Sequence, residues 1–180
     1  VAPRSVIILF IALLFGLATP FGIIYLMEIL DTTIRGRKDI EDKLSIPFLG
    51  DIPEYHGSTR QGSVVVRDNG RDSVSEAFRL IRSNLGFMSV KSGKLQIIMV
   101  TSSNPHAGKT FVTTNLAMTL ALADKKVVIV DLDLRRRTLS KQMGQRDNRN
   151  GVSGYISGTI ANLNDIVFQS GLHENLDIIF

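Results

Sequence analysis

The sequence contains no cysteine and only three histidines among its 180 residues. Without cysteine, disulfide-stabilised folds, thiolate metal sites and cysteine nucleophiles are all excluded. His56, His106 and His173 lie far apart in the sequence, which argues against a metal site built from several histidines. Glycine and proline are near average usage, and 44% of the residues are hydrophobic, so collagen-like and wholly disordered chains are excluded too.

An excess of charge of one sign is also missing. Lysine and arginine number 21 against 17 aspartates and glutamates, a formal net charge of +4. This small positive charge permits binding of an anionic ligand or a lipid surface. It is much lower than the concentrated positive charge of a dedicated nucleic-acid binder, so no nucleic-acid partner is expected. The chain begins at Val1, and its last residues resemble the start of a buried strand, so both ends are expected to belong to a longer protein.

The longest hydrophobic run lies near the start of the chain, where no residue from 5 to 27 is charged. As a helix this run would be about 35 Å long, enough to cross a hydrocarbon core of about 30 Å. A secretory signal peptide is the alternative, but its apolar region is shorter and is followed by a small-residue cleavage site, which residues 27–31 do not offer. The run therefore predicts one transmembrane helix, which Pro20 could kink.

Basic residues follow this span closely, whereas only Arg4 precedes it. The downstream group consists of Arg35, Arg37, Lys38 and Lys43. Because positive charge is retained on the cytoplasmic side, the rest of the chain is expected in the cytoplasm. Residues 56–72 are rich in Gly, Ser, Arg and Asp and are typical of a linker, in which residues 64–66 could form a short strand.

A phosphate-binding pattern stands between a strand and a helix. Residues 95–100 are apolar and β-branched and predict a buried parallel strand, and the segment after residue 110 has helical periodicity. Between them lies a Walker A loop that departs from the usual pattern, because Ser103 stands at the first glycine position. The nucleotide-binding residues expected here are Ser103, Asn104, Pro105, His106, Ala107, Gly108, Lys109 and Thr110.

The chemistry of such a loop follows from its backbone. Amide groups at the helix N-terminus point at phosphates, and Gly108 allows a close approach. Lys109 is expected to neutralise the β- and γ-phosphates and Thr110 to bind Mg²⁺. His106 could approach a phosphate, but the favoured interpretation is a solvent-exposed loop histidine.

Two carboxylates follow the next apolar run, residues 127–130. Ligands of open α/β sheets bind at the carboxyl ends of parallel strands, so Asp131 and Asp133 are expected at the site. Asp131 could hold Mg²⁺ or accept a proton, and the alternative is a helix-capping role. Arg135 could reach a phosphate. The pattern predicts an α/β fold, a P-loop NTPase-like parallel sheet with flanking helices preceded by one transmembrane helix, with domains at 1–31 (span), 32–72 (linker) and 73–180 (P-loop domain).

Residues 73–88 predict an amphipathic helix with apolar residues on one face and Glu76, Arg79 and Arg82 on the polar side. Ser73 and Glu76 have the spacing of a capping box, which would explain Glu76 without any partner.

Taken together, these motifs resemble the bacterial tyrosine kinases that are fused to polysaccharide co-polymerases. The resemblance rests on the span with its juxtamembrane region, on residues 76–82, on the loop ending at Thr110 and on residues 131–135. It implies an inner-membrane protein-tyrosine autokinase that uses ATP and Mg²⁺ and regulates the synthesis, chain length and export of capsular or extracellular polysaccharide. Lys109, Asp131 and Asp133 would be catalytic, Thr110 and Asp131 would hold the metal, and Glu76, Arg79 and Arg82 would join subunits into a ring.

The resemblance also implies membrane lipid, polysaccharide export machinery and a tyrosine phosphatase as partners. A third acidic motif and a tyrosine-rich tail, both typical of the family, are missing from these residues, so this piece alone is expected to be inactive. One alternative is a nucleotide-binding chain-length regulator without catalysis. A partitioning-type ATPase is the other, but the extra early lysine of that class is missing from residues 102–105.

Overall fold

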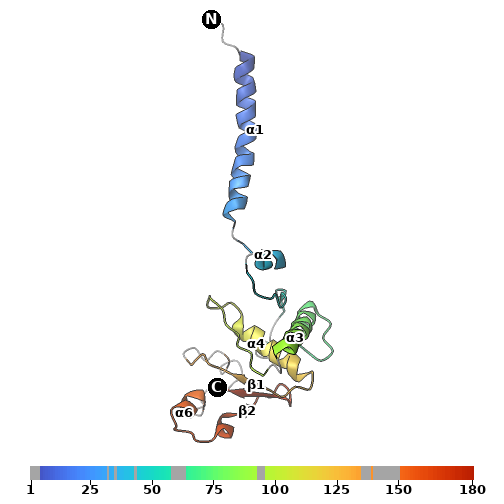
Figure 1. The fold of residues 1–180 in the computed structure, drawn as a ribbon, viewed down its shortest axis with the longest axis vertical. Coiled ribbons are helices and arrows are strands. Elements are labelled where there is room, and N and C mark those ends of the chain that lie inside the picture. The colour runs from blue at the N-terminus through green and yellow to red at the C-terminus, as the bar shows by residue number, and fades with distance from the viewer. Residues whose placement is uncertain are drawn as a thin grey trace. The chain divides into compact units, whose positions relative to one another are not determined.

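The computed structural model describes residues 5–31, 33–34, 36–42, 44–57, 64–92, 96–134, 139 and 151–180. The chain divides into two compact units, Val1–Phe48 and Leu49–Phe180 (Figure 1). The segment expected as a linker is thus shared between the units, and the second unit begins well before the P-loop domain boundary expected at residue 73.

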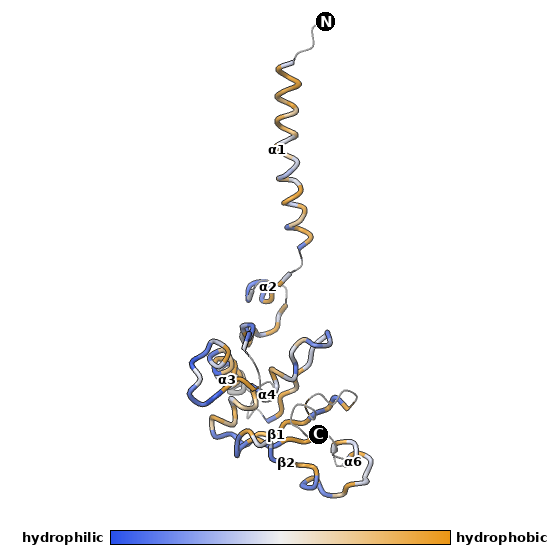
Figure 2. Tube along the Cα trace, turned by 180° about the vertical axis from the view of Figure 1, so that it is seen from behind, coloured by the Kyte–Doolittle hydropathy of each residue, from blue (hydrophilic) through white to orange (hydrophobic). Residues whose placement is uncertain are grey.

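The first unit contains helices α1 (Ser5–Leu30) and α2 (Arg37–Glu41). α1 is long and apolar enough to cross a membrane and buries none of its residues in the protein (Figure 2). It continues through Pro20, and the Thr19 hydroxyl donates a hydrogen bond to the Phe15 carbonyl at 2.6 Å, so this polar group is satisfied inside the helix. In α2, Arg37 pairs with Glu41 at 2.7 Å and lies over the Phe48 ring.

The second unit is an α/β fold. Its helices and strands, in chain order, are α3 (Ser73–Ser92), α4 (Lys109–Ala121), β1 (Val127–Val130), α6 (Val152–Ile156), the 3-10 helix η1 (Leu163–Ile166), β2 (Phe168–Gln169) and β3 (Leu176–Ile179). The described strands form one sheet in the order β1-β3-β2. β1 and β3 are parallel, with Val127 opposite Leu176 and Val130 opposite Ile179.

The sheet is mixed, because β2 pairs with β3 in the antiparallel direction. β2 and β3 are joined by a short turn, and parallel neighbours would need a crossover connection of a dozen or more residues. The prediction of an α/β sheet with flanking helices is confirmed, and the predicted parallel pairing holds between β1 and β3 but not between β3 and β2.

Helix α4 lies between the sheet and α3. On one side Ala117 and Ala121 pack in a buried cluster with Ile129, Leu176 and Ile178 of the sheet. On the other side Leu116 packs with residues of α3 and of the segment before it, namely Val66, Val74, Phe78 and Ile81. α3 therefore buries the apolar face that its periodicity predicts, and α4 is apolar on two sides because it is covered on two sides.

The segment before the loop is not the buried strand that its composition predicts. Residues 96–100 have no strand structure, and the side chains of Ile97 and Met99 are 87% and 82% exposed. A strand forms only where a neighbour completes its hydrogen bonds. Within the described sheet β1 pairs with β3 alone, and no described strand pairs with residues 96–100, so apolar β-branched composition was insufficient here.

The segment before α3 is packed on the helices. Asn84 donates a hydrogen bond to the Leu49 carbonyl at 2.8 Å, and Ile52 joins the cluster between α3 and α4. Further along, Val65 and Val66 are buried, and both of their amides donate to the Asn115 side chain of α4. Residues 64–66 do not form the short strand that seemed possible. The Val65 and Val66 backbone amides donate to the buried side chain of Asn115 and not to a neighbouring strand.

The N-terminus of α3 is capped one residue earlier than expected. The Asp72 carboxylate accepts hydrogen bonds from the Ser75 amide at 2.9 Å and the Ser75 hydroxyl at 2.6 Å. The capping box from Ser73 to Glu76 is therefore wrong, because a carboxylate with two acceptor oxygens precedes Ser73 and satisfies the first turn.

Replacing Asp72 with alanine should lower the free energy of unfolding by about 1 kcal/mol. The Ser75 hydroxyl, by donating to the carboxylate, lowers the pKa of Asp72 below its ordinary value of 3.8. A lowered pKa means that this stabilisation is present above the unfolded-state value and is lost as the pH falls through the folded-state value, that is, below about pH 4. Urea unfolding at pH 7 and pH 3 checks this; an Asp72→Asn variant with the same loss of stability on acidification as the parent would contradict it.

Candidate functional site

The loop that leads into α4 turns tightly through two residues with positive φ. Gly108 has φ 85° and His106 has φ 63°, both in the left-handed region. The Val112 amide then donates to the Gly108 carbonyl at 2.9 Å, which starts the helix at Lys109. The expected strand before the loop is not formed, but the loop and the helix start are where the sequence predicts them.

Space and charge at this helix start fit a phosphate. A Cβ atom added at Gly108 would meet no other atom within 4 Å, so a ligand can approach the backbone there. The first amides of a helix have no partner inside the helix and carry partial positive charge. Lys109 is the first residue of α4 and adds a full positive charge. Ser103, Asn104, Pro105 and Ala107 are all exposed along the same loop, as a ligand-binding role requires.

The ammonium group of Lys109 lies back over the loop. Its Nζ donates a hydrogen bond to the Ser102 hydroxyl oxygen at 2.8 Å, and that hydroxyl donates in turn to the Asn104 carbonyl at 2.8 Å. Ser102 was not among the site residues predicted from the sequence, because it precedes the Walker A pattern. The only sequence signal was a hydroxyl residue next to the first pattern position.

His106 occupies a conformation that suits glycine better. For a residue with a Cβ the left-handed region costs about 1 kcal/mol, although histidine tolerates it better than most. Replacing His106 with glycine should therefore leave the chain slightly more stable, by up to about 1 kcal/mol, and leave ATP affinity equal or higher. Thermal unfolding and a nucleotide titration of both proteins check this. A clear loss of affinity would instead show that the imidazole contacts the ligand.

The acidic pair lies at the carboxyl end of β1. β1 follows α4 through a tight turn in which Asp124 has φ 57°, and the two elements pack together, so β1 runs back along the helix. Its carboxyl end therefore points toward the loop end of α4, an arrangement that Figure 1 also shows. The backbone amide of Asp131 donates to the Ile179 carbonyl at 2.9 Å, which places this residue at the end of the ladder with β3.

The two aspartates differ in their surroundings. Asp131 is half-buried, and its Oδ1 accepts a hydrogen bond from the Asp133 amide at 3.0 Å, whereas Asp133 is exposed. This contact forms a local turn after β1, and residues 132–134 are not helical, so the helix-capping interpretation of Asp131 stays a prediction. Thr110 is half-buried in the first turn of α4. Arg135 lies outside the described residues, among which no cluster of three or more His, Cys, Asp and Glu side chains could hold a metal by itself.

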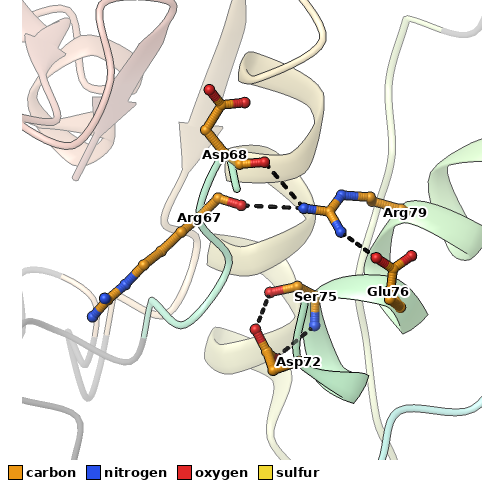
Figure 3. A network of polar contacts seen from close by, with 6 residues as sticks. All are labelled: Arg67, Asp68, Asp72, Ser75, Glu76 and Arg79. Atoms are coloured by element: carbon orange, nitrogen blue, oxygen red, sulfur yellow. Dashed lines mark hydrogen bonds and ion pairs between the residues drawn. The ribbon is translucent and has the colours of Figure 1, made fainter. Parts of the chain in front are cut away.

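Glu76 and Arg79 of α3 are engaged within the chain (Figure 3). Arg79 pairs with Glu76 at 2.6 Å and also donates to the backbone carbonyls of Arg67 and Asp68, at 3.3 and 3.2 Å. Arg82 donates to the Thr119 carbonyl of α4 at 3.0 Å. These contacts hold the turn before α3 and the C-terminal part of α4 to one helix face, so each arginine has a structural role whether or not it also meets a second subunit.

Known proteins are similar to this chain in sequence and in fold. Residues 98–178 match the family described as the CobQ/CobB/MinD/ParA nucleotide binding domain. The chain is 40% identical over 91 residues, 51% of its length, to the tyrosine-protein kinase Etk of Escherichia coli K12. It is 27% identical over 175 residues, 89% of its length, to a protein of Klebsiella pneumoniae named as a tyrosine-protein kinase in the cps region. It superposes on the kinase domain of Escherichia coli Etk with a TM-score of 0.69 and 29% identity, over 82% of this chain and 59% of that one.

The chain is homologous to the bacterial tyrosine kinases. This homology and the observed sheet confirm the resemblance and the P-loop NTPase-like fold that the motifs predict. The chain spans only 24% of the Klebsiella tyrosine kinase and 12% of Etk.

Proposed function

We propose that this chain is the membrane anchor and ATP-binding part of a protein-tyrosine autokinase. The observation that carries the proposal is the Lys109 ammonium, which is hydrogen-bonded back to Ser102 of the loop and follows the open turn at Gly108, in a chain homologous to tyrosine kinases. Phosphoryl transfer needs little covalent chemistry from a protein; it needs the phosphates and the acceptor hydroxyl held in line and their charge neutralised.

Each predicted site residue has a role in this proposal. The loop backbone from Ser103 to Gly108 surrounds the phosphates, and Lys109 neutralises the charge that develops on them. Thr110 and Asp131 hold Mg²⁺, which when bound supplies further positive charge to the phosphates. Asp133 completes the acidic group, and Arg135 reaches a phosphate. Oxygen donors of this kind are those that Mg²⁺ prefers.

α1 is proposed to cross the bacterial inner membrane, with the second unit in the cytoplasm. Its length and composition, its exposed apolar side chains and the basic residues that follow it support this placement. Lipid would then be the first partner of the chain.

The parent protein is proposed to regulate the synthesis, chain length and export of capsular or extracellular polysaccharide, with the export machinery and a tyrosine phosphatase as partners. The name of the Klebsiella relative, which places it in the cps region, supports the polysaccharide link. Glu76, Arg79 and Arg82 are proposed to reach a neighbouring subunit in a ring. Only part of Arg79 is available for this, because its side chain is 28% exposed while that of Glu76 is 61% exposed.

The test is tyrosine phosphorylation of the full-length protein in membranes supplied with ATP and Mg²⁺. The unsubstituted full-length protein should acquire phosphotyrosine, detected by mass spectrometry, and an Asp131→Asn variant should acquire very little. ATP binding without phosphotyrosine would favour the alternative, a chain-length regulator without catalysis. The present 180 residues alone are expected to bind nucleotide without appreciable transfer.

A further inference from the structure

The hydroxyl group of Ser102 has a fixed orientation. It has one proton, which it donates to the Asn104 carbonyl, so the remaining lone pairs are acceptors only. One of them accepts the hydrogen bond from Lys109 Nζ at 2.8 Å. The backbone of the loop therefore determines where the oxygen of Ser102 points, and that oxygen determines where the ammonium of Lys109 lies.

This contact does not compete with a phosphate. An ammonium group has three N–H donors, and the hydrogen bond to Ser102 uses one of them. Two donors stay available for phosphate oxygens. Lysine is also a flexible side chain that loses considerable rotamer freedom when it is ordered, and a contact made before the ligand arrives reduces the freedom still to be lost on binding.

We infer that Ser102 is a positioning residue that holds the Lys109 ammonium over the phosphate loop before nucleotide arrives. This inference rests on the proposed nucleotide site and adds to it a residue outside the Walker A pattern. Ser102 acts through Lys109 and needs no contact of its own with the ligand. A hydroxyl at this position is therefore required for tight binding, and a threonine can supply it as well as a serine.

The experiment uses the whole chain in detergent micelles and a fluorescent ATP analogue with Mg²⁺. Ser102→Ala should weaken binding about threefold to tenfold, the size of one lost hydrogen bond, and Ser102→Thr should bind like the parent. Ser157→Ala is the matched control: the Ser157 hydroxyl also donates to a nearby carbonyl, that of Gly154, and also has a side-chain partner, Thr159. It should leave affinity unchanged.

A double-mutant cycle separates positioning from a general effect on the loop. If Ser102 acts through Lys109, Ser102→Ala should cause no further loss in a Lys109→Met background. If it merely stabilises the loop, the two losses should add. Additive losses, or full affinity in Ser102→Ala alone, would overturn the inference and leave the nucleotide site intact.

A measurement without nucleotide tests the contact between Ser102 and Lys109 separately from nucleotide binding. Acetylation of Lys109 by acetic anhydride, followed by mass spectrometry, should be severalfold faster in Ser102→Ala than in the parent. The exposed lysines Lys125 and Lys126 are internal references and should not change. Equal rates at Lys109 would overturn the inference. A parent chain that fails to bind the ATP analogue would overturn the proposed function, and the inference with it, whatever the acetylation result.

Discussion

Replacing Lys109 with methionine should weaken binding of ATP with Mg²⁺ by about 30-fold or more, because a charge-assisted contact worth on the order of 2 kcal/mol is lost. Methionine has a similar length and lacks the charge, so the fold of α4 should survive. The measurement is a calorimetric titration of the whole chain in micelles, with circular dichroism to show that the helices are unchanged.

Lys125→Met is the matched control for charge. Lys125 is exposed in the turn after α4, so its removal lowers the net charge equally without touching the loop. Its ATP affinity should equal that of the parent. If Lys109→Met and Lys125→Met bind equally well, the phosphate-loop assignment is wrong, and the loop is then only a helix N-terminus with a chance Gly-Lys-Thr sequence.

Local sequence information was sufficient for the loop and the helix that follows it. A loop that ends in Gly-Lys-Thr and a helix with apolar residues at helical spacing depend on neighbours within a few positions, and α4 begins at Lys109, directly after this glycine, as predicted. The carboxylates after β1 were predictable for the same reason, since the strand ends directly before Asp131.

Features that depend on distant partners were not predictable in this way. Whether residues 96–100 become a strand depends on a neighbouring strand, and the apolar run itself carries no information about one. The contacts of Arg79 with two carbonyls of the preceding turn, and of Arg82 with the Thr119 carbonyl, depend on how the turn and α4 pack against α3. Charged residues at a spacing of three looked like a surface motif, and only the structure shows their internal partners.

Among these contacts, the one between residues farthest apart in the sequence is made by Asn115. It is fully buried in α4, and nothing in the sequence suggests why a polar residue should stand there. Its Oδ1 accepts hydrogen bonds from the Val65 and Val66 amides at 2.7 and 3.1 Å, and its Nδ2 donates to the Phe111 carbonyl at 2.8 Å. These hydrogen bonds therefore hold the segment before α3, at Val65 and Val66, against α4.

Replacing Asn115 with alanine should lower the free energy of unfolding by about 2–6 kcal/mol, because two buried backbone amides lose their acceptor and each costs about 1–3 kcal/mol when left unsatisfied. Urea unfolding of the whole chain in micelles, followed by circular dichroism, measures the loss. Trypsin cleavage after the exposed Arg67 should also become faster, since the segment is released more often.

Asn84→Ala is the matched control for this change. Asn84 is half-buried on α3 and donates one hydrogen bond, to the Leu49 carbonyl, so its loss should cost about 1 kcal/mol and leave cleavage after Arg67 nearly unchanged. Equal costs for the two variants would mean that the Val65 and Val66 amides find water when Asn115 is removed. In that case the segment is held mainly by the burial of Val66 among Val74, Phe78 and Leu116, and Val66→Ala should then be the more damaging substitution.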